Sequence, residues 1–279
     1  MVKDQYLNIL SLVWTALILL TAGLAQAKTD QILHQEYLQL NIKQVPPTNY
    51  LSVDNIKKIN LGFNKASADY IWLATIQYFG GGNPNLPYQS LSEMINTVVT
   101  LDPNFEYPYL FGGVVLPWQE EPQEALDLLD AGIKRFPNNG LLYYYAGSIA
   151  KLNLKDANRA AGYFQDSIGK IGTPPAASIL AGVSLTELDD RQFARAWWEG
   201  VLQTEENENI KERARAWLQY LNLVIDLEKL ISQVESSTDT KIQSLNDLVK
   251  MNILKEVPVS ELGKLKYNPQ TKKVSRILN

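Results

Sequence analysis

The chain has 279 residues, of which 46% are hydrophobic and 20% are charged, and its formal net charge is −4. This composition is typical of a folded protein with a sizeable core. The sequence has no basic stripe, so we do not expect a nucleic-acid partner. The sequence contains no cysteine, which excludes disulfides, thiolate catalysis and sulfur-ligated metal sites.

The first 27 residues are predicted to be either a cleaved signal peptide or a retained membrane anchor. Residues 7–24 form an uncharged apolar run of 18 residues, which is close to the roughly 20 residues that span a bilayer. Lys3 precedes the run, and Ala25-Gln26-Ala27 follows it as a small-x-small cleavage site. Both alternatives export the rest of the chain, and an uncleaved segment would bind the membrane through residues 7–24.

Residues 28–60 are predicted to be a connector, with a short helix over residues 31–40. The only histidine, His34, lies here among polar neighbours. A metal ligand or a general base needs partner groups, so we expect an ordinary surface residue. Two amphipathic helices then follow between residues 61 and 101, where apolar residues recur at helical spacing.

The stretch from residue 105 to residue 203 contains one short pattern three times, at a period of 34 or 35 residues. A glycine is followed by a small residue and, four positions later, by a bulky one. The three sets are Gly113, Ala125 and Leu129; Gly147, Ala160 and Phe164; and Gly182, Ala194 and Trp198. A period of this length predicts helix pairs that stack and bury one continuous core. The small residues should lie where helices cross closely.

These positions resemble the pattern of the tetratricopeptide repeat family, which runs aromatic, Leu-Gly, aromatic, then alanine, aromatic, alanine and proline. Tyr109, Tyr143 and Pro137 also match it, whereas Gly132, Ser167 and Val201 replace its late alanine. The resemblance implies an all-α solenoid of helical hairpins, with about four repeats over residues 61–204. Asp189-Asp190 is expected to cap a helix in this array and not to act as a catalytic dyad.

The C-terminal quarter of the chain reads differently from the repeats. Apolar residues at spacings of three and four predict a long helix over residues 205–235, which should cover the exposed end of the last repeat. Residues 236–279 are predicted to form a short helix and a hairpin, with strands over 264–267 and 273–277. This last segment resembles the C-terminal end of type II secretion pseudopilins without their acidic calcium loop. A small structural cap is the alternative interpretation.

A second resemblance concerns the location of the protein. The sequence LGFNKASADYIWLATIQYFGG, followed by LDPNFEYPYLFGGVVL, is similar to a group of bacterial tetratricopeptide proteins with an N-terminal hydrophobic helix. It implies an exported protein of the bacterial cell envelope, anchored in the inner membrane or periplasmic.

The sequence offers no catalytic, cofactor or metal site. None of the motifs HExxH, GxSxG, GxGxxG or paired Cys/His occurs, so we expect a protein without enzymatic activity. In the tetratricopeptide family the first helix of each unit lines a concave groove. The family pattern places there Tyr107, Leu110, Val114, Trp118, Leu141, Tyr144, Ser148, Lys151, Ile179, Val183 and Glu187.

This face is aromatic and apolar, which suits an amphipathic helix or an extended apolar peptide as the bound segment. The expected function is an envelope scaffold or assembly factor that binds a protein partner. The alternative is a permanent structural subunit of a larger membrane-associated complex. Another part of this chain, residues 28–60 or the long helix, is the other possible occupant of the groove, since monomers rarely expose apolar patches.

Overall fold

The structure is a computed structural model that describes residues 21–23, 26, 28, 52–80, 90–188, 190–238 and 240–277. The chain divides into two units, residues 1–52 and residues 53–279. In the first unit, residues 21–23, 26 and 28 are helical and exposed. The rest of the predicted signal or anchor segment, and the helix predicted over 31–40, lie outside the described residues. Among the described residues, no helix has both the length and the apolar character that crossing a membrane requires.

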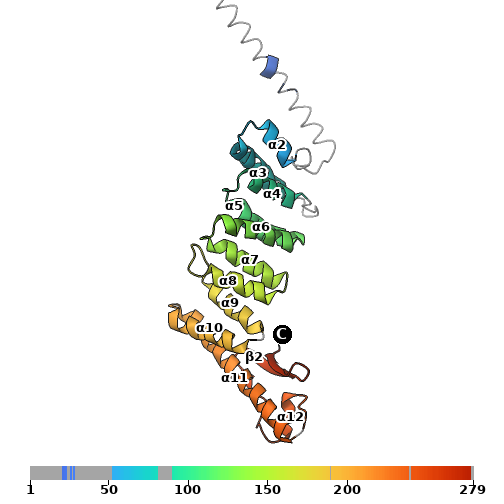
Figure 1. Ribbon diagram of the computed structural model, residues 1–279, viewed down its shortest axis with the longest axis vertical. Coiled ribbons are helices and arrows are strands. Elements are labelled where there is room, and N and C mark those ends of the chain that lie inside the picture. Colours follow the sequence, from blue (N-terminus) through green and yellow to red (C-terminus); the bar gives the residue numbers. More distant parts are fainter. Residues whose placement is uncertain are drawn as a thin grey trace, which may run out of the picture. The chain divides into compact units, whose positions relative to one another are not determined.

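The second unit is mainly helical, and its helices follow one another in chain order (Figure 1). Each helix from α3 to α11 contacts the next one along the chain. In order these are α2 (Val53–Ile59), α3 (Asn64–Gly80), α4 (Leu91–Leu101), α5 (Tyr107–Val115), the 3-10 helix η2 (Leu116–Gln119), α6 (Pro122–Arg135), α7 (Gly140–Leu152), α8 (Ala157–Ser167), α9 (Ala176–Glu187), α10 (Arg191–Thr204) and α11 (Glu208–Thr238). The predicted helical class is therefore confirmed for the described part of this unit.

Helix α2 lies inside the segment predicted to be a connector. It packs against α4, and its buried residue Ile56 joins a small cluster with Ala68 and Val98. A helix of seven residues with a single buried position has no periodicity to detect. The connector therefore contributes part of the core.

The threefold sequence pattern corresponds to a repeated contact between helices. At each glycine an added Cβ would come within 3.0 Å of the bulky side chain on the following helix. The pairs are Gly113 with Leu129, Gly147 with Phe164, and Gly182 with Trp198. The small residues Ala125, Ala160 and Ala194 are fully buried, as predicted. The bulky residue thus fills the space that the missing glycine side chain leaves.

Two other contacts recur at the same spacing. The hydroxyl of Tyr109 donates to the carbonyl oxygen of Pro103 at 3.3 Å, and the hydroxyl of Tyr143 donates to that of Pro137 at 3.2 Å. Each hydrogen bond links the first helix of a pair to the loop that precedes it.

The helix caps repeat as well. The side chains of Asp156 and Asp190 accept hydrogen bonds from backbone N–H groups in the first turns of α8 and α10, at 3.0 and 2.9 Å. Such a cap satisfies one of the N–H groups that a helix leaves without a partner at its start. The capping role predicted for Asp190 is therefore confirmed.

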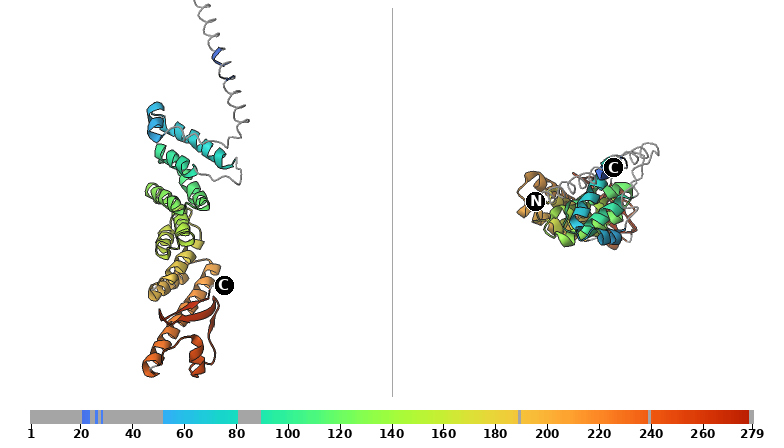
Figure 2. Two further views of the ribbon diagram at one scale, coloured as in Figure 1. Left: turned by 90° about the vertical axis from the view of Figure 1, so that its right-hand side faces the viewer. Right: turned by 90° about the horizontal axis from the view of Figure 1, so that it is seen from above.

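The C-terminal segment forms a short helix and a small sheet beside α11 (Figure 2). These elements are α12 (Leu245–Lys250), β1 (Val259–Ser260), β2 (Gly263–Asn268) and β3 (Lys273–Arg276), and the antiparallel sheet has the order β1-β2-β3. The predicted hairpin is present as β2 and β3. Strand β1 was not predicted, because a strand of two residues is too short to show the alternation of apolar and polar residues.

Helix α11 covers the end of the helical array. Its Trp217 stacks on Trp198 of α10 with ring centroids 5.7 Å apart. Tyr220, Leu221 and Val224 continue the same buried cluster along α11 toward the strands. The long helix predicted from the apolar spacing thus packs on the last helix pair, although it extends a few residues further than expected.

Candidate interaction surface

The predicted groove positions on α5 and η2 include three exposed side chains, which we call the exposed patch: Tyr107, Val114 and Trp118. Their exposed fractions are 59%, 44% and 82%. Leu110, from the same prediction, is half-buried and packs on the core. A tryptophan as exposed as Trp118 leaves a large rigid apolar area in water.

Local backbone geometry explains the exposure of Trp118. Leu116, two residues earlier, is fully buried and anchors η2 to the core. The 3-10 turn ends at Glu120, whose φ is 63°, and the N–H of Glu121 donates back to the carbonyl oxygen of Leu116 at 3.2 Å. Because the buried side chain of Leu116 fixes the position of this turn, the indole of Trp118 faces solvent.

Trp72, on α3, contacts one residue of the exposed patch, Tyr107. Trp72 makes edge-to-face contacts with Phe105, Tyr107 and Phe111, with ring centroids 5.6, 5.7 and 5.3 Å apart. Such pairs stabilise a particular ring orientation. The sequence predicted only that an amphipathic helix lies in this part of the chain. The contact of Trp72 with Tyr107 was not predictable from the spacing within α3.

The predicted positions on α7 are largely engaged within the chain. Tyr144 makes an edge-to-face contact with Phe164 at 5.8 Å, and the hydroxyl of Ser148 donates to the carbonyl oxygen of Tyr144 at 2.8 Å. Leu141 is half-buried. The ammonium of Lys151 pairs with the carboxylate of Glu187 at 2.9 Å and joins α7 to α9. This part of the predicted face is more polar and less open than the exposed patch.

The predicted positions on α9 meet the C-terminal part of the chain. Ile179 and Val183 are half-buried and pack against the cluster formed mainly by α10, α11 and the strands. Here the alternative occupant, a segment of this chain, covers part of the predicted face. Of the predicted positions, those on α5 and η2 are therefore the more open, and those on α9 are partly covered.

A pocket of about 450 Å³ lies beside the covered positions on α9. Its wall includes Val183 and Glu187 from α9, Trp217 from α11, and Lys266 and Arg276 from the strands. It is thus continuous with the predicted groove positions of the last helix pair.

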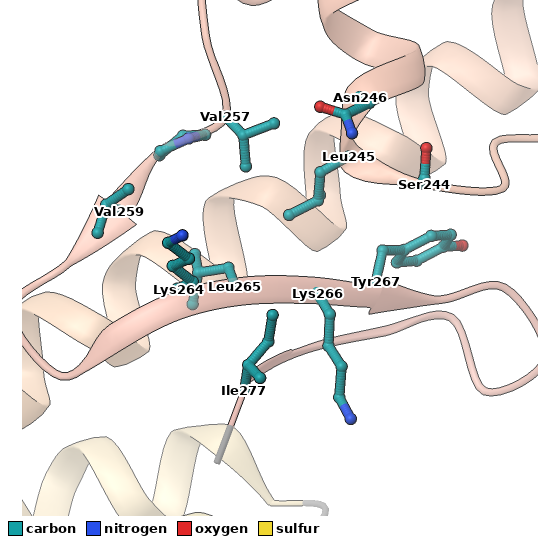
Figure 3. Close-up of a pocket in the computed structure, with 11 residues that line it drawn as sticks. Ser244, Leu245, Asn246, Val257, Val259, Lys264, Leu265, Lys266, Tyr267 and Ile277 are labelled. Carbon is teal, nitrogen blue, oxygen red and sulfur yellow. The ribbon is translucent and has the colours of Figure 1, made fainter. Parts of the chain in front are cut away.

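A second pocket, of about 520 Å³, lies between α12 and the sheet. Figure 3 shows Leu245, Val257 and Tyr267 on one side of β2 and the side chains of Lys266 and Ile277 on the other. The hydroxyl of Tyr267 is buried and has no hydrogen-bond partner in the described part of the chain. Burial, followed by the charge of Glu235, raises the pKa of this phenol, so Tyr267 stays neutral at physiological pH.

One carboxyl group near the exposed patch is unusual. Glu121 precedes α6 and makes no side-chain cap, and one of its carboxylate oxygens is buried without a hydrogen-bond partner in the described part. Burial, followed by the nearby charge of Glu124, raises the pKa of Glu121. The ionised form is therefore disfavoured in the folded protein.

Within the described residues, no group of three or more His, Asp or Glu side chains is arranged to hold a metal ion. Comparison with protein-family models gives no match for this chain, and comparison with curated proteins gives none. The feature of the described residues that suggests a function is therefore the exposed patch.

Proposed function

We propose that this protein is a non-enzymatic interaction protein that holds a segment of a protein partner against the exposed patch. The observation that carries the proposal is the exposure of two aromatic side chains, Tyr107 at the start of α5 and Trp118 on η2. Tyrosine and tryptophan dominate many interfaces because they bury a large rigid area at a modest cost in conformational entropy. An amphipathic helix or an extended apolar segment has the matching chemistry.

The proposed scaffold for this patch is a tetratricopeptide-like solenoid. Three features at a spacing of 34 or 35 residues support it: the glycine contacts on α5, α7 and α9, the tyrosine–proline hydrogen bonds, and the aspartate caps of α8 and α10. Such repeats stack so that each helix pair buries the apolar face of its neighbour. The side chains of the first helices of successive pairs would then together form one surface for a partner.

The proposed location is the bacterial cell envelope, with the folded unit outside the cytoplasm. It is supported by the apolar run over residues 7–24 and the small-x-small site after it. A reporter that is active only after export, fused at residue 60 or residue 240, tests this location. Activity at both positions supports it, and inactivity at both contradicts it.

An affinity pull-down of the full chain from native membranes in mild detergent tests the function itself. A partner recovered in less than stoichiometric amounts supports a scaffold or assembly factor. A stoichiometric, salt-resistant complex would instead favour the alternative, a permanent structural subunit. Recovery of the chain alone, under conditions that keep it folded, would contradict both.

A further inference from the structure

The connection between α2 and α3 carries three exposed apolar side chains within five residues. These are Ile59, Leu61 and Phe63, which we call the apolar turn, and their exposed fractions are 63%, 85% and 69%. Tyr70 and Leu73, which lie one turn apart on α3, are exposed as well. The first helices of the second unit therefore leave a large apolar area in water, at a place separate from the exposed patch.

Hydrogen bonds hold the apolar turn in one conformation. The side-chain oxygen of Asn60 accepts from the backbone N–H of Gly62 at 3.1 Å, and its Nδ2 donates to the side-chain oxygen of Asn64 at 2.7 Å. The backbone N–H of Phe63 donates to the carbonyl oxygen of Asn60 at 2.9 Å. A turn that is already fixed loses little conformational entropy when its side chains enter another environment.

The needs of the fold do not explain a leucine at position 61. Its φ is 52°, in the left-handed region that glycine and asparagine adopt readily and leucine rarely does. Because 85% of Leu61 is exposed, its side chain adds little to the core that could offset this strain. Leucine at this position is therefore better suited to a contact made outside the folded core.

Lysines flank the apolar turn. Lys57 and Lys58 precede it and Lys65 follows it, and all three are exposed and form no ion pair with a described residue. No acidic residue occurs between Asp54 and Asp69. On a chain whose net charge is −4, this stretch is locally cationic as well as apolar.

We propose that the apolar turn inserts into the surface of an anionic lipid membrane, with its apolar side chains below the headgroups and the three lysines at the lipid phosphates. Apolar side chains beside cations are the combination that binds such a surface. A leucine that projects from a turn is also surrounded on all sides by a lipid interface. The folded unit thus has a membrane contact of its own, separate from residues 7–24 and from the binding of a protein partner.

A fluorophore at one position of the full chain tests this contact without interference from residues 7–24. The chain contains no cysteine, so Leu61→Cys supplies a single site for a thiol-reactive fluorophore. Ile171→Cys is the matched control, because Ile171 is 79% exposed in the loop between α8 and α9. Each labelled chain is added to vesicles of phosphatidylcholine alone, and to vesicles of phosphatidylcholine and phosphatidylglycerol in equal parts.

The readout is quenching of the fluorophore by acrylamide, which is uncharged. With the anionic vesicles, we expect quenching of the label at position 61 to fall at least about twofold, since the interface shields it from water. The label at position 171 should be quenched equally with and without vesicles. The protection at position 61 should weaken as salt is added.

Replacement of the lysines tests the role of charge in the chain labelled at position 61. Glutamine at positions 57, 58 and 65 together should remove most of the protection, and arginine at the same positions should retain it. The control is the triple variant Lys134→Gln, Lys229→Gln, Lys255→Gln, which removes the same charge from exposed positions elsewhere. Melting curves establish that each variant remains folded. An equal loss in the control would show a general charge effect and overturn the proposal.

Three other results would overturn the membrane contact. The first is a label at position 61 that is quenched equally with and without anionic vesicles. The second is equal protection at positions 61 and 171, which would show only that the chain lies near the vesicle. The third is protection at position 61 in the absence of vesicles, which would show that protein covers the apolar turn. None of these results bears on the exposed patch, which the pull-down of a native partner tests separately.

Discussion

Gly182 and Gly200 show how strongly the effect of one methyl group depends on its neighbours. A Cβ at Gly182 would lie 2.4 Å from the indole of Trp198, which is fully buried and stacked on Trp217. A Cβ at Gly200, on the next helix, would meet no atom within 4 Å. The first glycine is required by packing, and the second only lowers the helix propensity of α10.

The substitution Gly182→Ala should therefore destabilise the protein by about 1–3 kcal/mol, the usual cost of overpacking a core. Gly200→Ala should instead stabilise it by up to about 1 kcal/mol, since alanine favours the helix. Urea denaturation of both variants beside the parent gives the comparison. Equal free energies of unfolding in the two variants would show that the glycine contact is not tight.

Glu121 occupies the position where Asp156 and Asp190 cap the later pairs, but it leaves the cap unmade. Glu121→Asp should supply the missing cap of α6 and shorten the side chain that now buries an unpaired oxygen. We expect a gain of about 1 kcal/mol in the free energy of unfolding. Asp156→Ala is the reference, with a loss of about 0.5–2 kcal/mol. A melting temperature of Glu121→Asp at or below that of the parent would disprove the equivalence of these positions.

At the scale of elements, α11 is held to the C-terminal segment by a carboxylate. Glu235 accepts from the ammonium of Lys272 and from the backbone N–H of Ile242, both at 3.1 Å. The hydrogen bond with Lys272, and then that with Ile242, hold the pKa of Glu235 below its ordinary value. Ionised Glu235 thus stabilises the fold above its unfolded pKa, and this contribution is lost as the pH falls through the lower, folded value.

The melting temperatures of the parent and of Glu235→Gln should accordingly differ at pH 7 and converge as the pH falls below the folded pKa. At pH 7 the variant should also exchange its amide hydrogens faster at Ile242 and the following residues. Glu199→Gln, which breaks an exposed pair with Arg195, is the control and should leave that exchange unchanged. A pH-independent difference would assign the effect to packing and not to charge.

The element boundaries show what a periodic sequence can and cannot predict. The spacing of small and bulky residues around Gly147 and Phe164 led directly to a contact, because a helix repeats its faces at fixed intervals. The hairpin of β2 and β3 also followed from local alternation. By contrast, α2 has one buried residue and β1 has two residues, so neither offers a pattern long enough to detect.

The family pattern selected the candidate positions but carried no information on their exposure. Tyr107 and Val183 were placed on it by the same family pattern, yet one is exposed and the other packs against the C-terminal cluster. The difference arises in part from α11, which packs beside α9. Local periodicity holds no information on such encounters.

At the scale of the whole molecule, substitutions of two tryptophans distinguish an effect on binding from an effect on stability. Trp118 is exposed on η2 and can be removed without opening the core, whereas Trp198 is buried against Gly182 and Trp217. Trp198→Ala should cost about 3–5 kcal/mol of stability. Any loss of binding in that variant would follow from unfolding.

The most direct test of the interaction surface is the pull-down yield of Trp118→Ala from native membranes, measured beside its melting temperature. If the exposed patch binds the partner, this variant should melt with the parent and lose about 2 kcal/mol or more of binding free energy, the scale of an interface hot spot. The recovered partner would then fall well below the parental amount. A Trp118→Ala variant that recovers the full amount of partner would contradict the assignment of the exposed patch as the binding surface.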